Sequence, residues 1–219
     1  CLSEAQHSPW ALSQFEPYGL EDLNRARLMN RVDSKFVLPM AWLPELLIQL
    51  TAHYRVLDIK GQRSFAYVNQ YFDTSSFDFY RAHHNGKLNR FKVRHRRYID
   101  TANEYLEVKL KNNKQRTEKT RVPVVSQACP MKQSAEFLME RLGSQWQSLG
   151  VAQTSGYRRI ALANEADAER LTLDCNLWYQ TPDKGRSIKF SHFFIAELKQ
   201  EKLSKHSKFF QLMSEKGAR

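Results

Sequence analysis

The sequence predicts an α+β fold in which antiparallel strands form a sheet or a closed β-barrel with a few helices outside it. Many short segments rich in Val, Tyr, Phe and Thr alternate between apolar and polar residues with the period of a strand. Few helix-like segments separate them, whereas parallel strands need a crossover helix at nearly every step. Several strands also carry charged residues at every second position, and a closed barrel accommodates such faces best.

Helix-like segments are sparse along the chain. Residues 44–54 have Pro in the first turn and a Leu/Ile stripe at helical spacing, so they are the best candidate for a helix. Residues 20–28 and 131–146 place apolar side chains on neighbouring turns, and residues 203–213 predict a closing helix.

Strand-like segments fill most of the remaining chain. Clusters of Asn, Asp, Gly and Lys lie between them and suit turns. We expect strands at residues 30–38, 54–59, 66–72, 88–99, 104–111, 116–124, 154–163, 170–179 and 187–198, the last with a break inside it.

Length and composition fit one globular domain that spans residues 1–219. Hydrophobic residues make up 42% of the 219 residues, which is ample for a core, and no apolar run is long enough for a transmembrane helix. The first residues lack the layout of a signal peptide. Three scattered cysteines without a C-x-x-C pair exclude a disulfide framework and a cysteine zinc site. We therefore expect a reducing, cytoplasmic environment.

The charge balance predicts an anionic partner. The chain has 34 Lys and Arg against 23 Asp and Glu, a formal net charge of +11. Residues 87–121 alone hold twelve Lys or Arg and four acids, so this stretch supplies +8 of the total. The excess is local rather than spread over the whole surface.

The basic residues alternate along strands. Since residues i and i+2 share a face, Lys92, Arg94 and Arg96 lie together, opposite Phe91 and Val93. Residues 31–35, 107–111, 116–121 and 197–199 repeat this alternation. For one strand alone, a face in contact with water is the simplest explanation. Many such strands would need more helices to cover their apolar faces than the sequence supplies.

A barrel with the charged faces inside and the apolar faces under the helices resolves this difficulty. Two unit charges 4 Å apart repel by about 4 kcal/mol at an effective dielectric constant of roughly 20, so a basic interior needs counter-charge. A polyanion inside the barrel would provide it. Nucleic acid is disfavoured, because its binding surfaces are open faces or grooves.

Other types of site find little support. The histidines show no H-x-x-x-H pattern for a metal, and His83 and His84 are expected at the surface beside a turn. Glycine-rich phosphate loops are absent from the sequence. Aromatic residues in the strands suit packing, so the site of an adenine base stays unassigned.

Short motifs in a fixed order resemble a known family. In order along the chain, they are residues 31–36 (RVDSKF), 71–73 (YFD), 92–98 (KVRHRRY), 107–111 (EVKLK), 157–161 (YRRIA), 170–177 (RLTLDCNL), 197–199 (ELK) and 207–209 (SKF). Over residues 15–213, the chain resembles the VTC domain, the polyphosphate polymerase branch of the triphosphate tunnel, or CYTH-like, superfamily.

The resemblance implies a tunnel of about eight antiparallel strands in which the γ-phosphate of ATP passes to a growing chain of inorganic polyphosphate. A divalent metal, usually Mn²⁺ with Mg²⁺ as the other candidate, is held by a glutamate, which corresponds to Glu197. Lys205 competes with Lys208 for the position of a late lysine. The residues matched to the family's phosphate binders are Lys35, Arg94, Arg96, Lys109, Arg159, Arg170 and Lys208. On the same charged faces, we assign to binding of the anionic cofactor Lys92, Lys111 and Lys199.

Three functions stay open from the sequence. The hydrolase branches of the superfamily open with Glu-x-Glu-x-Lys, whereas this chain has Arg31-Val-Asp33-Ser-Lys35, which favours the polymerase branch. Hydrolysis of triphosphates or polyphosphate is the second candidate, and a non-catalytic receptor for polyphosphate or inositol phosphates is the third. ATP and polyphosphate are the expected partners, and a membrane protein that takes up the product is compatible with them.

Overall fold

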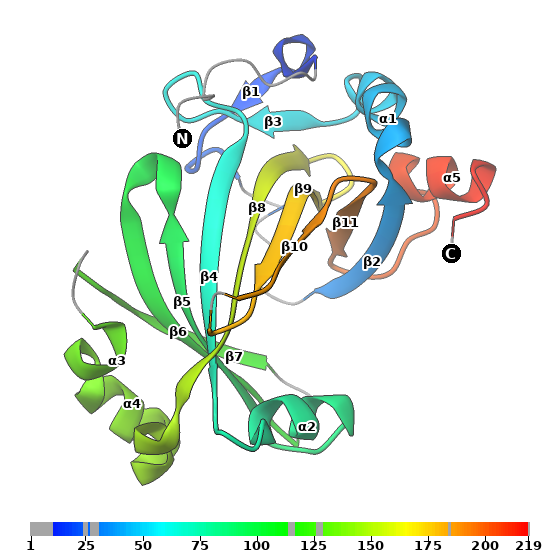
Figure 1. The fold of residues 1–219 in the computed structure, drawn as a ribbon. Coiled ribbons are helices and arrows are strands. Elements are labelled where there is room, and N and C mark those ends of the chain that lie inside the picture. Colours follow the sequence, from blue (N-terminus) through cyan, green and yellow to red (C-terminus); the bar gives the residue numbers. More distant parts are fainter. Residues whose placement is uncertain are drawn as a thin grey trace. The chain divides into compact units, whose positions relative to one another are not determined.

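The computed structural model of the protein describes residues 11–23, 26, 31–113, 117–125, 129–183 and 185–218. It is a mixed α+β structure in which long antiparallel strands predominate and short helices flank them (Figure 1), as the sequence predicts. The chain divides into two compact units, each assembled from separate stretches. Unit 1 comprises Cys1–Phe65, Arg158–Leu177 and Phe190–Arg219, and unit 2 comprises Ala66–Tyr157 and Trp178–Lys189.

In unit 1, β2 (Val32–Pro39), β11 (Phe193–Gln200) and β9 (Glu169–Gln180) pair antiparallel, and the second half of β8 (Gly150–Asn164) follows β9. At the far side of β8, β3 (Arg55–Leu57) pairs antiparallel with it. The two-residue strand β1 (Pro17–Tyr18) pairs in parallel with β3.

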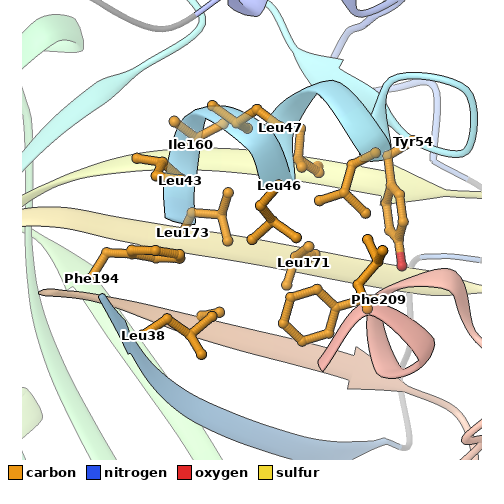
Figure 2. Packing of buried hydrophobic residues seen from close by; sticks show 14 of the residues in the cluster. Leu38, Leu43, Leu46, Leu47, Tyr54, Ile160, Leu171, Leu173, Phe194 and Phe209 are labelled. Atoms are coloured by element: carbon orange, nitrogen blue, oxygen red, sulfur yellow. The ribbon is translucent and has the colours of Figure 1, made fainter. Parts of the chain in front are cut away.

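The core of unit 1 lies between this sheet and two helices, α1 (Leu43–Leu50) and α5 (Lys208–Glu215). Burial alternates along β11, where Phe194, Ala196 and Leu198 are fully buried. Figure 2 shows their neighbourhood, with Leu46 of α1 and Phe209 of α5 meeting the same side of the strands. Each buried Leu or Phe side chain contributes about 1.5–3 kcal/mol by leaving water, so this face of the sheet is fixed toward the helices.

In unit 2, the first half of β8 leads to four neighbouring strands. Their order is β4 (Phe65–Asp73), β5 (Arg90–Tyr98), β6 (Asn103–Lys111) and β7 (Thr117–Pro123), and the pairs β4–β5, β5–β6 and β6–β7 are antiparallel. The short strand β10 (Ser187–Phe190) pairs with β9.

A second core covers one face of this sheet. It contains Phe72, Val93 and Val108 from the strands together with Phe79 of α2 (Asp78–His84) and Leu138 of α4 (Ala135–Leu142). Phe91 and Val93 of β5, like Leu106 and Val108 of β6, are two positions apart and contact this core, so the intervening positions form the opposite face. That face is the charged one in unit 2, as it is in unit 1.

The predicted strands are confirmed with small shifts in their ends, and the break expected within 187–198 separates β10 from β11. The helix predicted at 44–54 is α1, and the one predicted at 131–146 is divided into α3 (Pro130–Gln133), α4 and the 3-10 helix η5 (Gly143–Ser148). The closing helix begins later than predicted, at Lys208, because the Ser207 hydroxyl accepts a hydrogen bond from the Phe210 amide and caps it. The helix predicted at 20–28 is wrong for residues 20–23, where 20 and 21 form a turn and 22 and 23 are irregular; Ala26 has 3-10 geometry, and 24, 25, 27 and 28 lie outside the described residues.

Helix α2 is absent from the sequence prediction, and the end of β4 explains why it forms. The carboxylate of Asp73 accepts hydrogen bonds from the amides of Phe79 and Tyr80, each at 2.9 Å. These amides belong to the first turn of α2. Amides in the first turn of a helix have no carbonyl acceptors within the helix. A cap from a residue several positions upstream leaves no standard sequence signature, so the segment resembles a turn.

The strand order of the described residues is an open path of eight, β2-β11-β9-β8-β4-β5-β6-β7, with β1, β3 and β10 attached to it. Since the path does not close on itself, the predicted barrel is an approximation. Within the part of the chain that the structure describes, none of the helices has the length and apolar character needed to cross a membrane.

Candidate functional site

The charged face of unit 1 consists of residues aligned across three strands. The register places Lys35 of β2 opposite Glu197 of β11, and Asp33 opposite Lys199. Lys199 in turn lies opposite Arg170 of β9. Because the alternate residues of these strands are in the core, the charged side chains share the other face.

Glu197 is the central acid of this face. Lys199 donates a hydrogen bond to one carboxylate oxygen, and the Lys35 amine lies 3.4 Å from the other. Burial alone would raise the pKa of Glu197, but Lys199, Lys35 and Arg159 outweigh that effect and lower the pKa to about 2. The side chain keeps 18% of its surface exposed, and that of Lys35 keeps 66%. Glu197 is therefore an ionised and accessible carboxylate whose contact with Lys35 is loose.

Arg159 of β8 is held rigidly beside this acid. Its Nε and one terminal nitrogen donate to the two carboxylate oxygens of Asp174 at 2.6 and 2.7 Å. Such a bidentate pair fixes the plane of the guanidinium group. Arg159 and Arg170 are both half-buried on the charged side of their strands.

Lys208 is placed differently from the strand lysines. It is the first residue of α5 and half-buried, whereas Lys205 is exposed in the preceding turn. Both residues belong to unit 1, and both stay candidates for the position of the late lysine.

The charged face of unit 2 is formed in the same way by β5, β6 and β7. One row across the strands contains Lys92, Lys109 and Lys119. The next row contains Arg94 and Glu107, with Arg121 beyond them on β7. Arg96 follows in a third row, opposite Tyr105, and Lys111 lies opposite Arg90 at the other end.

Glu107, unlike Glu197, is fully buried. Only 1% of this residue is exposed, and its two oxygens lie 2.6 Å from Nε of Arg94 and 2.6 Å from Nζ of Lys119. Burial would raise the pKa of Glu107, yet these two cations hold it below its usual range. The pairing also orients the Arg94 guanidinium group. Arg94 is therefore already paired with the Glu107 carboxylate when no ligand is bound.

Arg96 is held by neutral groups instead. It is 7% exposed, and it donates hydrogen bonds at 2.8 Å to the side-chain carbonyl oxygen of Asn69 and to the hydroxyl of Tyr157. Its guanidinium carbon also lies 5.3 Å from the centre of the Tyr67 ring. Arg96 is thus a buried, preorganised cation that no carboxylate neutralises within these contacts.

The sequence matches the family model of the VTC domain over residues 30–218. The chain belongs to the VTC domain family. No match in sequence to this VTC domain is found among the curated proteins.

Solved structures show the same fold at low sequence identity. The protein HpAC1 from Hippeastrum, described as a proposed adenylyl cyclase with a dominant triphosphatase activity, is similar with a TM-score of 0.52 at 15% identity, covering 86% of this VTC domain and 88% of that chain. A proposed adenylate cyclase from Bacillus halodurans gives a TM-score of 0.51 at 14% identity, covering 86% and 89%. At identities of 14–15%, these similarities show the fold of the VTC domain and nothing about its activity.

The structure brings the predicted residues together in two groups. Unit 1 contains Lys35, Arg159, Arg170, Glu197, Lys199 and Lys208, and unit 2 contains Lys92, Arg94, Arg96, Lys109 and Lys111. Their roles stay predictions. The sequence reasoning did not single out Glu107, Asp174 or Lys119 as functional. Period-two alternation already placed Glu107 on the charged face, so that signal could have found it.

Proposed function

We propose that this VTC domain is a polyphosphate polymerase that transfers the γ-phosphoryl group of ATP to a growing chain of inorganic polyphosphate. The observation that carries the proposal is the pair of basic strand faces in a chain of the VTC family, one of which has an accessible ionised carboxylate, Glu197. We treat residues 1–219 as one domain that contains both faces. We also place the protein in the cytoplasm, where ATP is available, with a membrane protein as a compatible recipient of the product.

The chemistry requires alignment and positive charge. An oxygen of the terminal phosphate of the chain forms a bond to the γ-phosphorus of ATP while the bond from that phosphorus to the β–γ bridging oxygen breaks, and ADP leaves with the electron pair. The attacking oxygen is already ionised at neutral pH, so neither a protein nucleophile nor a general base is required. Fixed cations lower the barrier by stabilising charge on the peripheral oxygens.

The basic residues differ in how firmly their side chains are held, and we assign their roles accordingly. Arg159 and Arg96 are fixed by Asp174 and by Asn69 with Tyr157, so they offer preorganised forks to phosphate. In unit 1, Lys35 is exposed and able to turn toward a ligand. The remaining phosphate binders of the proposal are Arg94, Lys109, Arg170 and Lys208, and the binders of the ATP phosphates are Lys92, Lys111 and Lys199.

A divalent ion, Mn²⁺ or Mg²⁺, fits Glu197 as a shared ligand. Among the described residues, no group of three or more His, Cys, Asp or Glu could hold a metal without help. Ions of this kind are commonly held by one or two carboxylates together with substrate phosphates, and Glu197 is ionised and partly accessible. When bound, the ion would neutralise phosphate charge and polarise the transferred group.

The decisive experiment incubates the purified protein with ATP and Mn²⁺ and separates the products on a gel. A ladder of phosphate chains is the expected result. Release of inorganic phosphate without a ladder would instead show hydrolysis, and binding of polyphosphate without turnover would show a receptor. Either outcome contradicts the polymerase.

Two adjacent arginines of β8 provide a matched control. Arg159 lies on the charged face. Arg158 is two positions from Ile160 of the core, so it lies on the opposite face, and it donates hydrogen bonds to Ser64. Arg159→Lys removes the bidentate fork, so turnover should fall by at least tenfold. Arg158→Lys should retain activity. Equal activity of the two variants would contradict the assignment of Arg159.

A further inference from the structure

A group of buried polar side chains lies at one end of the core of unit 1. Glu169 begins β9, Gln200 ends β11, and the two lie opposite each other in the sheet. Tyr54 comes from the segment between α1 and β3, and Ser207 directly precedes α5. Each of these four residues is at most 3% exposed. We call them the polar cluster.

Glu169 is the centre of the polar cluster. The Gln200 amide donates a hydrogen bond to one carboxylate oxygen at 2.7 Å, and the Tyr54 hydroxyl donates to the other. Figure 2 shows the Tyr54 side chain pointing from the end of α1 toward α5. Burial raises the pKa of Glu169, and hydrogen bonds from Tyr54, Gln200 and Ser207 act against that effect. One carboxyl group therefore accepts from donors of three different segments.

The side chain of Gln200 also closes the turn that follows β11. Its amide nitrogen donates to the Ser204 carbonyl oxygen at 3.0 Å, and its oxygen accepts from the Ser204 amide at 3.2 Å. The Ser204 hydroxyl accepts from the His206 amide at 3.3 Å. Gln200 thus contacts Glu169 with one hydrogen bond and the turn with two, so the position of residues 201–207 depends on Glu169.

The first turn of α5 is fixed by the same cluster. The Ser207 hydroxyl interacts with Glu169 and also accepts from the Phe210 amide at 3.2 Å, which caps the helix. The Gln211 side chain donates to the His206 carbonyl oxygen at 3.0 Å. Lys208 is the first residue of α5, so its backbone is held by the cap on one side and by the turn on the other.

Glu169 acts from the core side of the sheet. Leu171, two positions along β9, is fully buried, whereas Arg170 lies opposite Lys199 on the charged face. A ligand on the charged face therefore has no access to Glu169. A buried carboxyl group costs stability that an apolar side chain would not cost, and pairing of the strands does not require it. What the carboxyl group adds is a fixed connection between β11 and α5.

We propose that Glu169 is a positioning residue for Lys208. It holds Gln200 and Ser207, and through them the turn and the first residue of α5, in the arrangement from which the Lys208 amine binds phosphate. This inference rests on the proposed function, because Lys208 is one of the phosphate binders assigned there. Lys205, at an exposed position of the same turn, is not the residue through which Glu169 acts.

A double-mutant cycle with the full chain tests this by titration with tripolyphosphate. Lys208→Met removes one charge-assisted hydrogen bond and should weaken binding by about tenfold. Glu169→Gln places an NH₂ group against a donor of the cluster, so the turn should shift and binding should weaken several-fold. Since Glu169 acts through Lys208, the double variant should bind no more weakly than Lys208→Met alone. A cycle with Lys205→Met in place of Lys208→Met should show independent losses.

Tyr54→Phe is the matched control for a purely structural role. It removes a buried hydrogen bond to the same carboxyl group and lowers stability, but it leaves the contacts of Gln200 and Ser207 in place. Its affinity for tripolyphosphate should match the wild type. Ser207→Ala provides a second route to the turn, which serves if Glu169→Gln does not fold. It should weaken binding several-fold, and that loss should also disappear in the Lys208→Met background.

Three results would overturn the positioning role: losses at Glu169 and Lys208 that multiply, an equal loss in Tyr54→Phe, or no binding of tripolyphosphate at all. Coupling to Lys205 instead of Lys208 would likewise contradict it. The gel assay separates this inference from the proposed function. A ladder from ATP with multiplying losses would remove the role of Glu169 and leave the polymerase. Coupled losses without a ladder would do the reverse.

Discussion

The two units have similar charged faces but surround the central glutamate differently. Each has a sheet with an apolar face under helices and a charged face opposite, and each charged face contains a central glutamate. Glu107 of unit 2 is enclosed, with two cations at 2.6 Å. Glu197 of unit 1 is partly exposed, and one of its lysines lies 3.4 Å away with most of its surface in water. The comparison indicates that Glu107 fixes its neighbours, whereas Glu197 has the freedom to exchange partners.

The largest expected effect is on activity at Glu197. Glu197→Gln keeps the shape but removes the charge, so turnover should fall by about a hundredfold or more and the dependence on Mn²⁺ should shift. Rates measured against Mn²⁺ concentration check this. Glu45→Gln, which also loses a lysine partner but lies on α1, is the control and should leave both unchanged. If the Mn²⁺ dependence is unshifted and substantial activity remains, Glu197 is a salt-bridge partner and not a metal ligand.

The next largest effect is on stability at Glu107. Glu107→Gln leaves Arg94 and Lys119 without their buried counter-charge, which should cost about 3 kcal/mol of unfolding free energy. Urea denaturation measures the change. Glu118→Gln, at an exposed position near the start of β7, should stay within about 0.5 kcal/mol of the wild type. A stable Glu107→Gln protein that has merely lost activity would show that Glu107 also exchanges partners.

The pH dependence sharpens the contrast with a third acid. Glu169 is 1% exposed and receives hydrogen bonds from Tyr54 and Gln200, and burial raises its pKa. A raised folded-state pKa gives stability at low pH that is lost as pH rises through that value. The lowered pKa of Glu197 does the opposite, because its contribution is present above the unfolded value and is lost as pH falls toward about 2.

Unfolding free energies of two variants over a pH series test these opposite signs. The stability of Glu169→Gln relative to the wild type should increase from about pH 5 to pH 8. That of Glu197→Gln relative to the wild type should decrease from about pH 3 to pH 6. Parallel slopes for the two variants would contradict the proposed difference in their environments.

The smallest expected effect on stability is at Lys35. An ion pair this exposed contributes little, so Lys35→Met should change the unfolding free energy by about 0.5 kcal/mol or less. Its affinity for polyphosphate should nevertheless fall several-fold, because the lysine is free to bind the ligand. Thermal melting and a binding titration measure the two quantities. A large loss of stability would mean that Glu197 is held as firmly as Glu107.

The sequence predicted the strands and their faces well, because period-two alternation is a local property. It placed Lys92, Arg94 and Arg96 on one face, and the structure agrees. The partners of each side chain depend on register between strands, which is not local. The sequence therefore predicts a basic face that needs counter-charge from a ligand, whereas Arg94 is already held by Glu107, and Arg96 by Asn69 and Tyr157.

The sequence analysis missed helix α2, and the position of His83 beside the strands, for a related reason. The cap from Asp73 makes the helix, and the helix brings His83 to the strands. From the sequence, His83 is a surface residue beside a turn. Only the structure relates it to four cations of other elements, Arg90, Lys92, Lys109 and Lys111.

The pairing of β2 with β11 has a consequence for synthesis of the chain. Pro39 and Phe193 are neighbours in the sheet although 154 positions separate them in the sequence. At roughly 5–20 residues per second, a ribosome needs about 8–30 s to make the intervening segment. During that interval β2 lacks its strand partner, and Phe36 and Leu38 lack the part of the core that β11 and α5 provide. The first long strand of the chain therefore has to wait for almost the whole synthesis before its pairing is complete.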